Sequence, residues 1–119
     1  MADQAPILYG IRNCDTIKKA RLWLESQKIP YQFHDVRKDG LDQETVEYWL
    51  EQLGWEQIIN RRGTSWRQLP EPERESMDDA RAVSAILNQP TLFKRPILQQ
   101  GNAVHVGFKP DQYEAIFIV

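Results

Sequence analysis

Apolar and polar positions near the start of the chain follow two different periods. Residues 7–11 (ILYGI) form a short apolar run and residues 31–36 alternate apolar and polar side chains, which predicts two strands. Between these strands, apolar side chains recur at helical spacing, at Ile17, Ala20, Trp23 and Leu24. A strand, a helix that ends before Pro30 and a second strand predict a parallel pair joined by a right-handed crossover.

The middle of the chain, from about residue 42 to 90, has helical patterns and no strand signal. Asp42 suits the N-cap of a helix that ends at Gly54, and Asp78 suits the N-cap of a second helix that a later proline closes. A single helical turn is expected at 65–69, ahead of two further prolines. We therefore expect an all-helical insertion in this part of the chain.

Strand patterns return near the end of the chain. Residues 96–99 and 103–106 flank a loop whose Gly101 suits a hairpin turn, and Pro110 suits the first position of a last helix. The whole order is β-α-β, a helical insertion, then β-β-α, which is the plan of a thioredoxin-like α/β fold with a mixed sheet. We expect residues 1–119 to form one domain of this kind.

Composition narrows the classes of function. Of the 119 residues, 41% are hydrophobic and 27% charged, a balance typical of a globular protein, and the net charge of −2 gives no reason to expect nucleic-acid binding. No apolar run is long enough to span a membrane, and the N-terminus lacks the pattern of a signal peptide. The single cysteine cannot form an internal disulfide. We expect a cytoplasmic monomer that binds neither a membrane nor nucleic acid.

The lone cysteine, Cys14, stands where the first strand turns into the first helix. A sulfur at this place faces free backbone N–H groups and the positive end of the helix dipole, which stabilise a thiolate. Arg12, Asn13 and Lys18 are close in the sequence and are candidate binding residues for an anionic partner. The alternative is a small side chain of the core, because free cysteine is often buried. The polar neighbours of Cys14 favour a reactive thiol.

Two further segments carry candidate binding residues. Arg95 and Pro96 precede the third strand, where thioredoxin folds have a cis-proline that faces the cysteine, and we expect this bond to direct Arg95 toward the thiol. Arg61 and Arg62 lie in a loop that can present guanidinium groups to a carboxylate or an oxyanion. In each case the alternative is a solvated surface arginine. With one cysteine and two separated histidines, no metal site is expected.

Five segments of the chain resemble the arsenate-reductase-like family and, within it, a YffB-type branch. The segments are residues 9–20 (YGIRNCDTIKKA), 35–40 (DVRKDG), 60–66 (NRRGTSW), 93–97 (FKRPI) and 106–110 (VGFKP). Each is short, but their order and spacing together are specific, and the resemblance extends from about residue 6 to 117.

This resemblance implies a thioredoxin-like fold with a helical insertion, a catalytic cysteine at Cys14, and thiol chemistry linked to glutathione and glutaredoxin. Arsenate reductases of the family hold the oxyanion with arginines. One of these matches Arg95 in this chain, and another matches Arg61 or Arg62. At the place of the third arginine this chain has Lys109.

Two positions depart from the pattern of the arsenate reductases. Those enzymes carry a histidine four residues before the cysteine, where this chain has Gly10. They also carry a small hydroxyl residue three positions after the cysteine, where this chain has Ile17. The family's transcription regulators, which bind RNA polymerase, often have a second cysteine at that latter place, so Ile17 excludes their disulfide switch.

The leading hypothesis is an enzyme, a glutathione-dependent thiol reductase. Cys14 would form a mixed disulfide that glutathione or glutaredoxin then reduces, because no second cysteine can resolve it. The sheet edge beside Pro96 would accept the peptide backbone of glutathione, and no tightly bound cofactor is expected. Two alternatives stay open: an arsenate reductase coupled to glutathione and glutaredoxin, and a non-enzymatic Spx-like regulatory protein that binds RNA polymerase.

Overall fold

The computed structural model describes residues 5–118, and the chain divides into two compact units. The sheet unit comprises the residues up to 39 together with those from 95 onward. The helical unit comprises residues 40–94, against an expected insertion of about 42–90.

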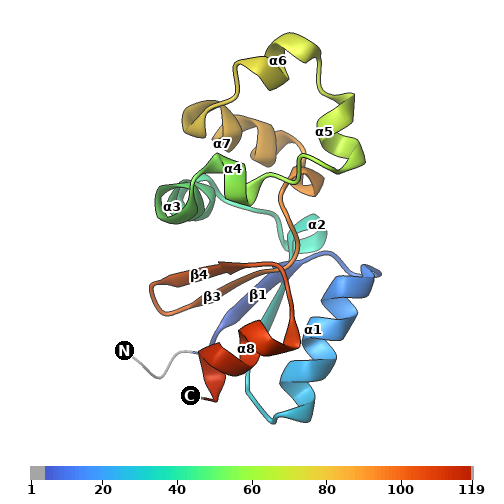
Figure 1. Cartoon of the computed structure of the whole chain (residues 1–119), viewed down its shortest axis with the longest axis vertical. Helices are drawn as coiled ribbons and strands as arrows, with labels where there is room; N and C mark the ends of the chain where they lie inside the picture. The colour runs from blue at the N-terminus through green and yellow to red at the C-terminus, as the bar shows by residue number, and fades with distance from the viewer. Residues whose placement is uncertain (1–4, 119) are drawn as a thin grey trace. The chain divides into compact units, whose positions relative to one another are not determined.

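The sheet unit is built on four strands in the order β2-β1-β3-β4 (Figure 1). The strands are β1 (Ile7–Gly10), β2 (Gln32–Asp35), β3 (Ile97–Gln100) and β4 (Ala103–Val106). β1 is parallel to β2 and antiparallel to β3, and β3 is antiparallel to β4. The sheet is therefore mixed, and the parallel pair predicted from the first part of the chain is confirmed.

Two helices, α1 (Asp15–Ser26) and α8 (Pro110–Phe117), cover one face of this sheet (Figure 1). The core between the helices and the sheet contains Leu8, Ala20, Leu24, Leu98 and Tyr113. Leu8 and Leu98 are paired across β1 and β3, and both are completely buried. This packing holds the amino end of α1 against the carboxyl end of β1.

The second strand is shorter than its pattern predicts. The alternation predicts a strand through Val36, but β2 ends one residue earlier and α2 (Val36–Asp39) adds one helical turn. The carboxylate of Asp35 explains the change, because its Oδ1 accepts hydrogen bonds from the backbone N–H groups of Arg37 (3.0 Å) and Lys38 (3.3 Å). Such bonds offer the backbone an alternative to the sheet.

The helical unit contains α-helices of 4 to 11 residues and one 3₁₀ turn. They are α3 (Gln43–Leu53), α4 (Trp55–Ile58), α5 (Thr64–Gln68), α6 (Glu71–Glu75), α7 (Asp79–Asn88) and the 3₁₀ turn η1 (Pro90–Leu92). The N-caps predicted at Asp42 and Asp78 are confirmed, since each side chain accepts a hydrogen bond of 2.8 Å from the N–H group three residues on. Gly54 ends α3 with φ of 82°, a conformation that favours glycine.

Some elements of the helical unit were not predicted. They are α4, α6 and η1. The latter two each begin beside a proline, which a first helical turn tolerates because its N–H groups need no partner there. Ile59 and Phe93 form an isolated antiparallel bridge, although no strand signal was found in this region. The ring of Phe93 lies 5.2 Å from that of Trp49, and both side chains are completely buried.

Candidate functional site

Several predicted site residues lie at one end of the sheet. Gly10 is paired with Asp35, and Ile97 is paired with both Tyr9 and Val106. The carboxyl ends of β1, β2 and β4 therefore meet the amino end of β3. The loop that holds the cysteine follows β1 at this end, the predicted cis-proline precedes β3, and the first turn of α8 follows β4.

Cys14 is the N-cap residue of α1. Its backbone is extended (φ −101°, ψ 127°) and its carbonyl accepts the first helical hydrogen bond, 3.0 Å from the N–H group of Lys18. The side chain is half-buried and makes no capping hydrogen bond. The preceding residue, Asn13, has φ of 67°, a left-handed conformation that asparagine tolerates. The sulfur therefore stands at an open helix N-terminus, and the alternative of a core cysteine is not what the geometry favours.

Arg12 is held at this end of the sheet by an ion pair. Its Nε lies 3.7 Å from Oδ2 of Asp35, at the carboxyl end of β2. The exposed fraction of the Arg12 side chain is 64%, whereas that of Asp35 is 10%. The pair therefore keeps a largely exposed guanidinium group near the cysteine loop, where it can meet an anion from solvent.

A cavity of about 300 Å³ opens beside the cysteine loop. It is lined by Arg12, Asn13, Ile17, Lys18 and Arg21. The first two and Lys18 were predicted as binding residues, and they are brought together here. Arg21 was missed, although it lies seven residues after Cys14 and so shares a stripe of the helix with Lys18. That spacing was the signal that could have found it.

Gly10 and Ile17 are in direct steric contact. A Cβ atom added at Gly10 would collide with Cδ1 of Ile17 and lie 2.9 Å from its Cγ1. Ile17 belongs to the first turn of α1 and is almost completely buried. The two positions that depart from the arsenate-reductase pattern, Gly10 and Ile17, thus pack against each other. The isoleucine fills the space that a side chain at position 10 would need.

The predicted cis peptide bond between Arg95 and Pro96 is confirmed. Pro96 is buried and its carbonyl accepts a hydrogen bond of 2.8 Å from the N–H group of Gly107, which ties the start of β3 to the end of β4. Lys109 is the exposed N-cap residue of α8, and its N–H group donates to Oε1 of Gln112 (3.2 Å). Both cations, Arg95 and Lys109, belong to the sheet unit.

Arg61 and Arg62 belong to the helical unit, where they line a second basic cavity of about 450 Å³. Its lining residues are Glu56, Ile59, Asn60, Arg61, Arg62 and Lys94. The guanidinium group of Arg61 lies 5.3 Å from the ring centre of Trp55, close enough for a cation–π interaction. The N–H group of Arg62 donates to Oδ1 of Asn60 (3.2 Å), which shapes the loop.

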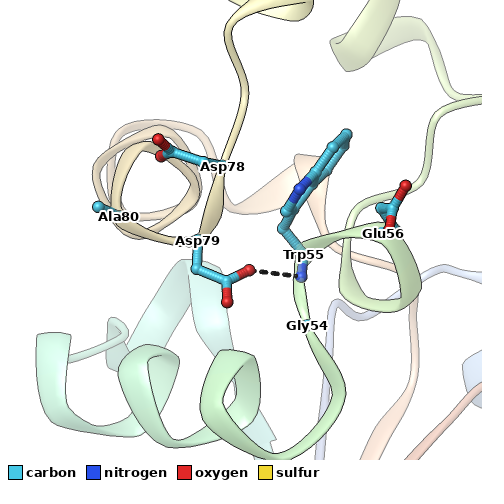
Figure 2. A pocket seen from close by; sticks show the side chains of 6 residues that line it. All are labelled: Gly54, Trp55, Glu56, Asp78, Asp79 and Ala80. Carbon is cyan, nitrogen blue, oxygen red and sulfur yellow. Dashed lines mark hydrogen bonds between the residues drawn. The ribbon is translucent and has the colours of Figure 1, made fainter.

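Another cavity, of about 590 Å³, contains none of the predicted site residues. Figure 2 shows it between the start of α4 and the start of α7, with Trp55, Glu56, Asp78 and Asp79 around it. Oδ1 of Asp79 accepts a hydrogen bond of 2.9 Å from the N–H group of Trp55. With three carboxylates on its wall, this cavity does not suit the anionic partner expected for the thiol.

Within residues 5–118, no cluster of three or more histidine, cysteine, aspartate or glutamate side chains could hold a metal ion. The ring of His34 packs 4.9 Å from that of Tyr9, and burial lowers the pKa of His105 below its ordinary value. In the same described part of the chain, no helix is both long and apolar enough to cross a membrane.

Comparison with known proteins identifies the family. A model of the ArsC family matches residues 9–116. The chain belongs to the ArsC family. An uncharacterized protein from Haemophilus influenzae is 43% identical over 110 residues, which cover 92% of this chain and 96% of that protein. The global transcriptional regulator Spx of Lactiplantibacillus plantarum is 28% identical over 108 residues, covering 89% of this chain and 81% of Spx.

Two solved structures resemble the chain closely. A protein named YffB matches with a TM-score of 0.89 and 45% identity, over 93% of this chain and 97% of that protein. An arsenate reductase (ArsC) related protein from Brucella melitensis matches with a TM-score of 0.78 and 49% identity, over 100% and 99% of the two chains. The predicted family, its YffB-type branch and the thioredoxin-like α/β fold are therefore confirmed.

Proposed function

We propose that this ArsC-family chain is a glutathione-dependent thiol reductase whose nucleophile is Cys14. The observation that carries the proposal is the position of Cys14, half-buried at the uncapped N-terminus of α1, beside a cavity lined by Arg12 and Lys18. Free backbone N–H groups, the helix dipole and nearby cations favour a thiolate at such a place. Membership of the ArsC family supports thiol chemistry in general. The use of glutathione as the reductant is our proposal.

The proposed cycle has two exchanges. The Cys14 thiolate attacks the glutathione sulfur of a substrate–glutathione disulfide, the S–S bond breaks, and the substrate leaves as a thiolate that takes a proton from water. A glutathione thiolate then attacks the glutathione sulfur of the new mixed disulfide, which releases Cys14 and forms oxidised glutathione. Over the cycle the substrate sulfur is reduced and glutathione is oxidised. Because Cys14 is the single cysteine, the second thiol must come from glutathione or from glutaredoxin.

The other predicted cations are proposed as binding residues. Arg95 stands at the amino end of β3 and Lys109 at the N-cap of α8, so both belong to the sheet end that carries the thiol loop. Arg61 and Arg62 line the basic cavity of the helical unit. Arg95 and either Arg61 or Arg62 are expected to bind the carboxylates of glutathione, and Lys109 is a further candidate binding residue. Single changes to glutamine should raise the KM for glutathione and leave the single-turnover adduct at Cys14 detectable.

Exposure of the purified chain to oxidised glutathione tests the proposal. Mass spectrometry should show one glutathionyl adduct per chain, peptide mapping should place it at Cys14, and added glutathione should remove it. The control is Cys14→Ser, which should keep the circular dichroism spectrum of the parent and form no adduct. A folded parent protein that stays unmodified, or an adduct that glutathione does not remove, would sink the proposal.

Arsenate reduction is the second candidate, and the name of the Brucella relative favours it. Its structural difficulty is the pair of Gly10 and Ile17, because the isoleucine fills the place of the histidine that the resemblance assigns to arsenate reductases. An assay with arsenate, glutathione and glutaredoxin decides directly. If arsenite forms and its formation depends on Cys14, arsenate reduction becomes the leading hypothesis in place of thiol reduction.

A regulatory role is the third candidate, favoured by the identity of 28% to Spx over most of the chain. It predicts binding to RNA polymerase without turnover. Co-purification with RNA polymerase should then survive the change Cys14→Ser, whereas both enzyme hypotheses predict that this variant is folded and inactive.

A further inference from the structure

The cavity beside the cysteine loop contains one cation that neither the sequence prediction nor the proposed cycle uses. Arg21 lies on α1 seven residues after Cys14, and Lys18 lies four residues after it. Positions i, i+4 and i+7 share one stripe of a helix. At 1.5 Å of rise per residue, the backbone of Arg21 lies about 10 Å along the helix from Cys14.

Two neighbours, Tyr31 and Phe33, hold the side chain of Arg21 in place. Its Nε donates a hydrogen bond of 2.9 Å to the hydroxyl of Tyr31, and that hydroxyl donates to Oε2 of Glu25 (2.6 Å). Its guanidinium carbon lies 4.3 Å from the ring centre of Phe33. A guanidinium group stacked on an aromatic ring and bonded at Nε loses little further freedom when an anion binds.

The terminal nitrogens of Arg21 keep their hydrogen-bond donors. Within residues 5–118, the Nε bond to Tyr31 is the single hydrogen bond of the Arg21 side chain, and the side chain has no ion pair. The nearest acidic residue on the same stripe, Glu25, accepts its hydrogen bond from Tyr31 instead. The two terminal nitrogens therefore supply up to four N–H donors in the planar arrangement that suits a carboxylate.

Charge in the cavity is of one sign. Besides Arg21, the cavity is lined by two further cations, Lys18 and Arg12. Lys18 is exposed and, among residues 5–118, has no ion pair. The ion-pair partner of Arg12, Asp35, is buried. Three cations around about 300 Å³ favour an anion with more than one charge, or an anion that extends along the stripe from the thiol.

We propose that this cavity is a carboxylate subsite for the thiol partner of Cys14, in which Arg21 is the main binding residue and Lys18 and Arg12 add positive charge. The proposal rests on the proposed thiol reductase function and narrows its substrate class. The preferred partner is a small thiol or disulfide that carries a carboxylate able to reach Arg21, two helical turns along α1, while its sulfur is at Cys14. Arg21 acts on binding and takes no part in the sulfur exchange.

A comparison of disulfides of different charge tests the subsite. Rates of mixed-disulfide formation at Cys14 are measured with oxidised glutathione, which is anionic, and with hydroxyethyl disulfide, which is neutral. In Arg21→Gln the ratio of the anionic to the neutral rate should fall about tenfold, the loss expected for one charge-assisted hydrogen-bonded pair. Tyr31→Phe, which frees the guanidinium group, should lower the same ratio about threefold.

The matched control is Lys19→Gln, which removes the same charge from an exposed position of α1 outside the cavity. Its ratio should stay at the parent value. If Lys19→Gln and Arg21→Gln lower the ratio equally, the effect is general attraction by a positive surface and the subsite is wrong. If Arg21→Gln leaves the ratio unchanged, the subsite is wrong while the reductase proposal stands.

A binding measurement separates failure of the subsite from failure of the function. S-methylglutathione, which cannot react, is titrated into Cys14→Ser, and the Nε–Hε signal of Arg21 is followed by NMR. A saturable shift that is lost when both carboxylates of the ligand are esterified supports the subsite even if Cys14 reacts with neither disulfide. An unchanged signal at millimolar ligand overturns it, whatever the reactivity of Cys14.

Discussion

The first turn of α1 differs from the first turns of α3 and α7. The latter two begin at Asp42 and Asp78, whose carboxylates accept a hydrogen bond from a backbone N–H group of the helix. α1 begins at Cys14, whose side chain caps nothing. α3 and α7, the two longest helices of the helical unit, thus have capped N-termini, while α1 of the sheet unit leaves its first N–H groups without a side-chain cap. Cysteine at this position gives up stability that an aspartate would provide.

The two units also differ in charge. The sheet unit has nine basic and seven acidic residues, a net charge of +2, whereas the helical unit has six basic and ten acidic residues, a net charge of −4. The net charge of the whole chain, −2, hides this separation. An open helix N-terminus within a positively charged unit favours binding of an anion. The net charge of a whole chain is therefore a poor guide to the charge around one site.

The packing of α1 against β1 gives the largest expected change in the free energy of unfolding. Gly10→Ala should lower the free energy of unfolding by about 2–3 kcal/mol, because the new Cβ collides with Ile17 in the first turn of the helix. Urea unfolding followed by circular dichroism measures the change. The same substitution in an Ile17→Ala background should cost much less, and an equal cost in both backgrounds would show that α1 is not seated on Gly10.

The next largest effect is expected from removing the N-cap side chain of α3 or α7. Asp42→Ala and Asp78→Ala should each lower the free energy of unfolding by about 1 kcal/mol, because each leaves a backbone N–H group without its side-chain acceptor. Asp42→Asn keeps an acceptor oxygen and serves as the matched control. Were Asp42→Asn to cost as much as Asp42→Ala, the charge and not the hydrogen bond would be the stabilising element.

Closing the open N-terminus of α1 should have the opposite sign. Cys14→Asp places a good N-cap residue on a backbone that is already extended, so we expect a gain of about 0.5–1 kcal/mol in the free energy of unfolding. The same variant should form no adduct with oxidised glutathione. A loss of stability in Cys14→Asp would mean that the N–H groups of α1 are not available to a capping side chain.

The smallest effect concerns an ion pair at the start of α7. Nη1 of Arg81 lies 2.8 Å from Oδ2 of Asp78, with exposed fractions of 59% and 52% for the two side chains. Because water screens such a pair, Arg81→Gln should cost less than about 0.5 kcal/mol. The difference from the parent protein should vanish in unfolding curves recorded at about 1 M salt, where the screening length is roughly 3 Å.

The order of elements could be predicted from the sequence because its periods of two and 3.6 are long enough to distinguish strand from helix. The caps at Asp42 and Asp78 were predictable because the capping hydrogen bond is local. α2 was not, since it depends on where the carboxylate of Asp35 turns. α6 was not, because Pro70 and Pro72 are compatible both with a break in a helix and with the first turn of a new one.

The candidate site was predictable only in part. Cys14, Arg12 and Lys18 could be grouped because they are neighbours in the sequence. Arg21 was missed because its role depends on contacts with Tyr31, just before β2, and with Phe33 of β2, which only the fold brings together. The steric exclusion between Gly10 and Ile17 was invisible for the same reason: the two positions were noted separately, and their contact is three-dimensional.

The four tryptophans are divided unequally between the units. Trp23 alone belongs to the sheet unit, while Trp49, Trp55 and Trp66 belong to the helical unit, with the rings of Trp55 and Trp66 stacked at 6.0 Å. Three of the four fluorescent indole groups therefore lie in the unit that lacks the cysteine. Trp23→Phe would give a chain whose emission reports the helical unit alone, so that a spectral change on modification of the thiol reveals whether that unit responds.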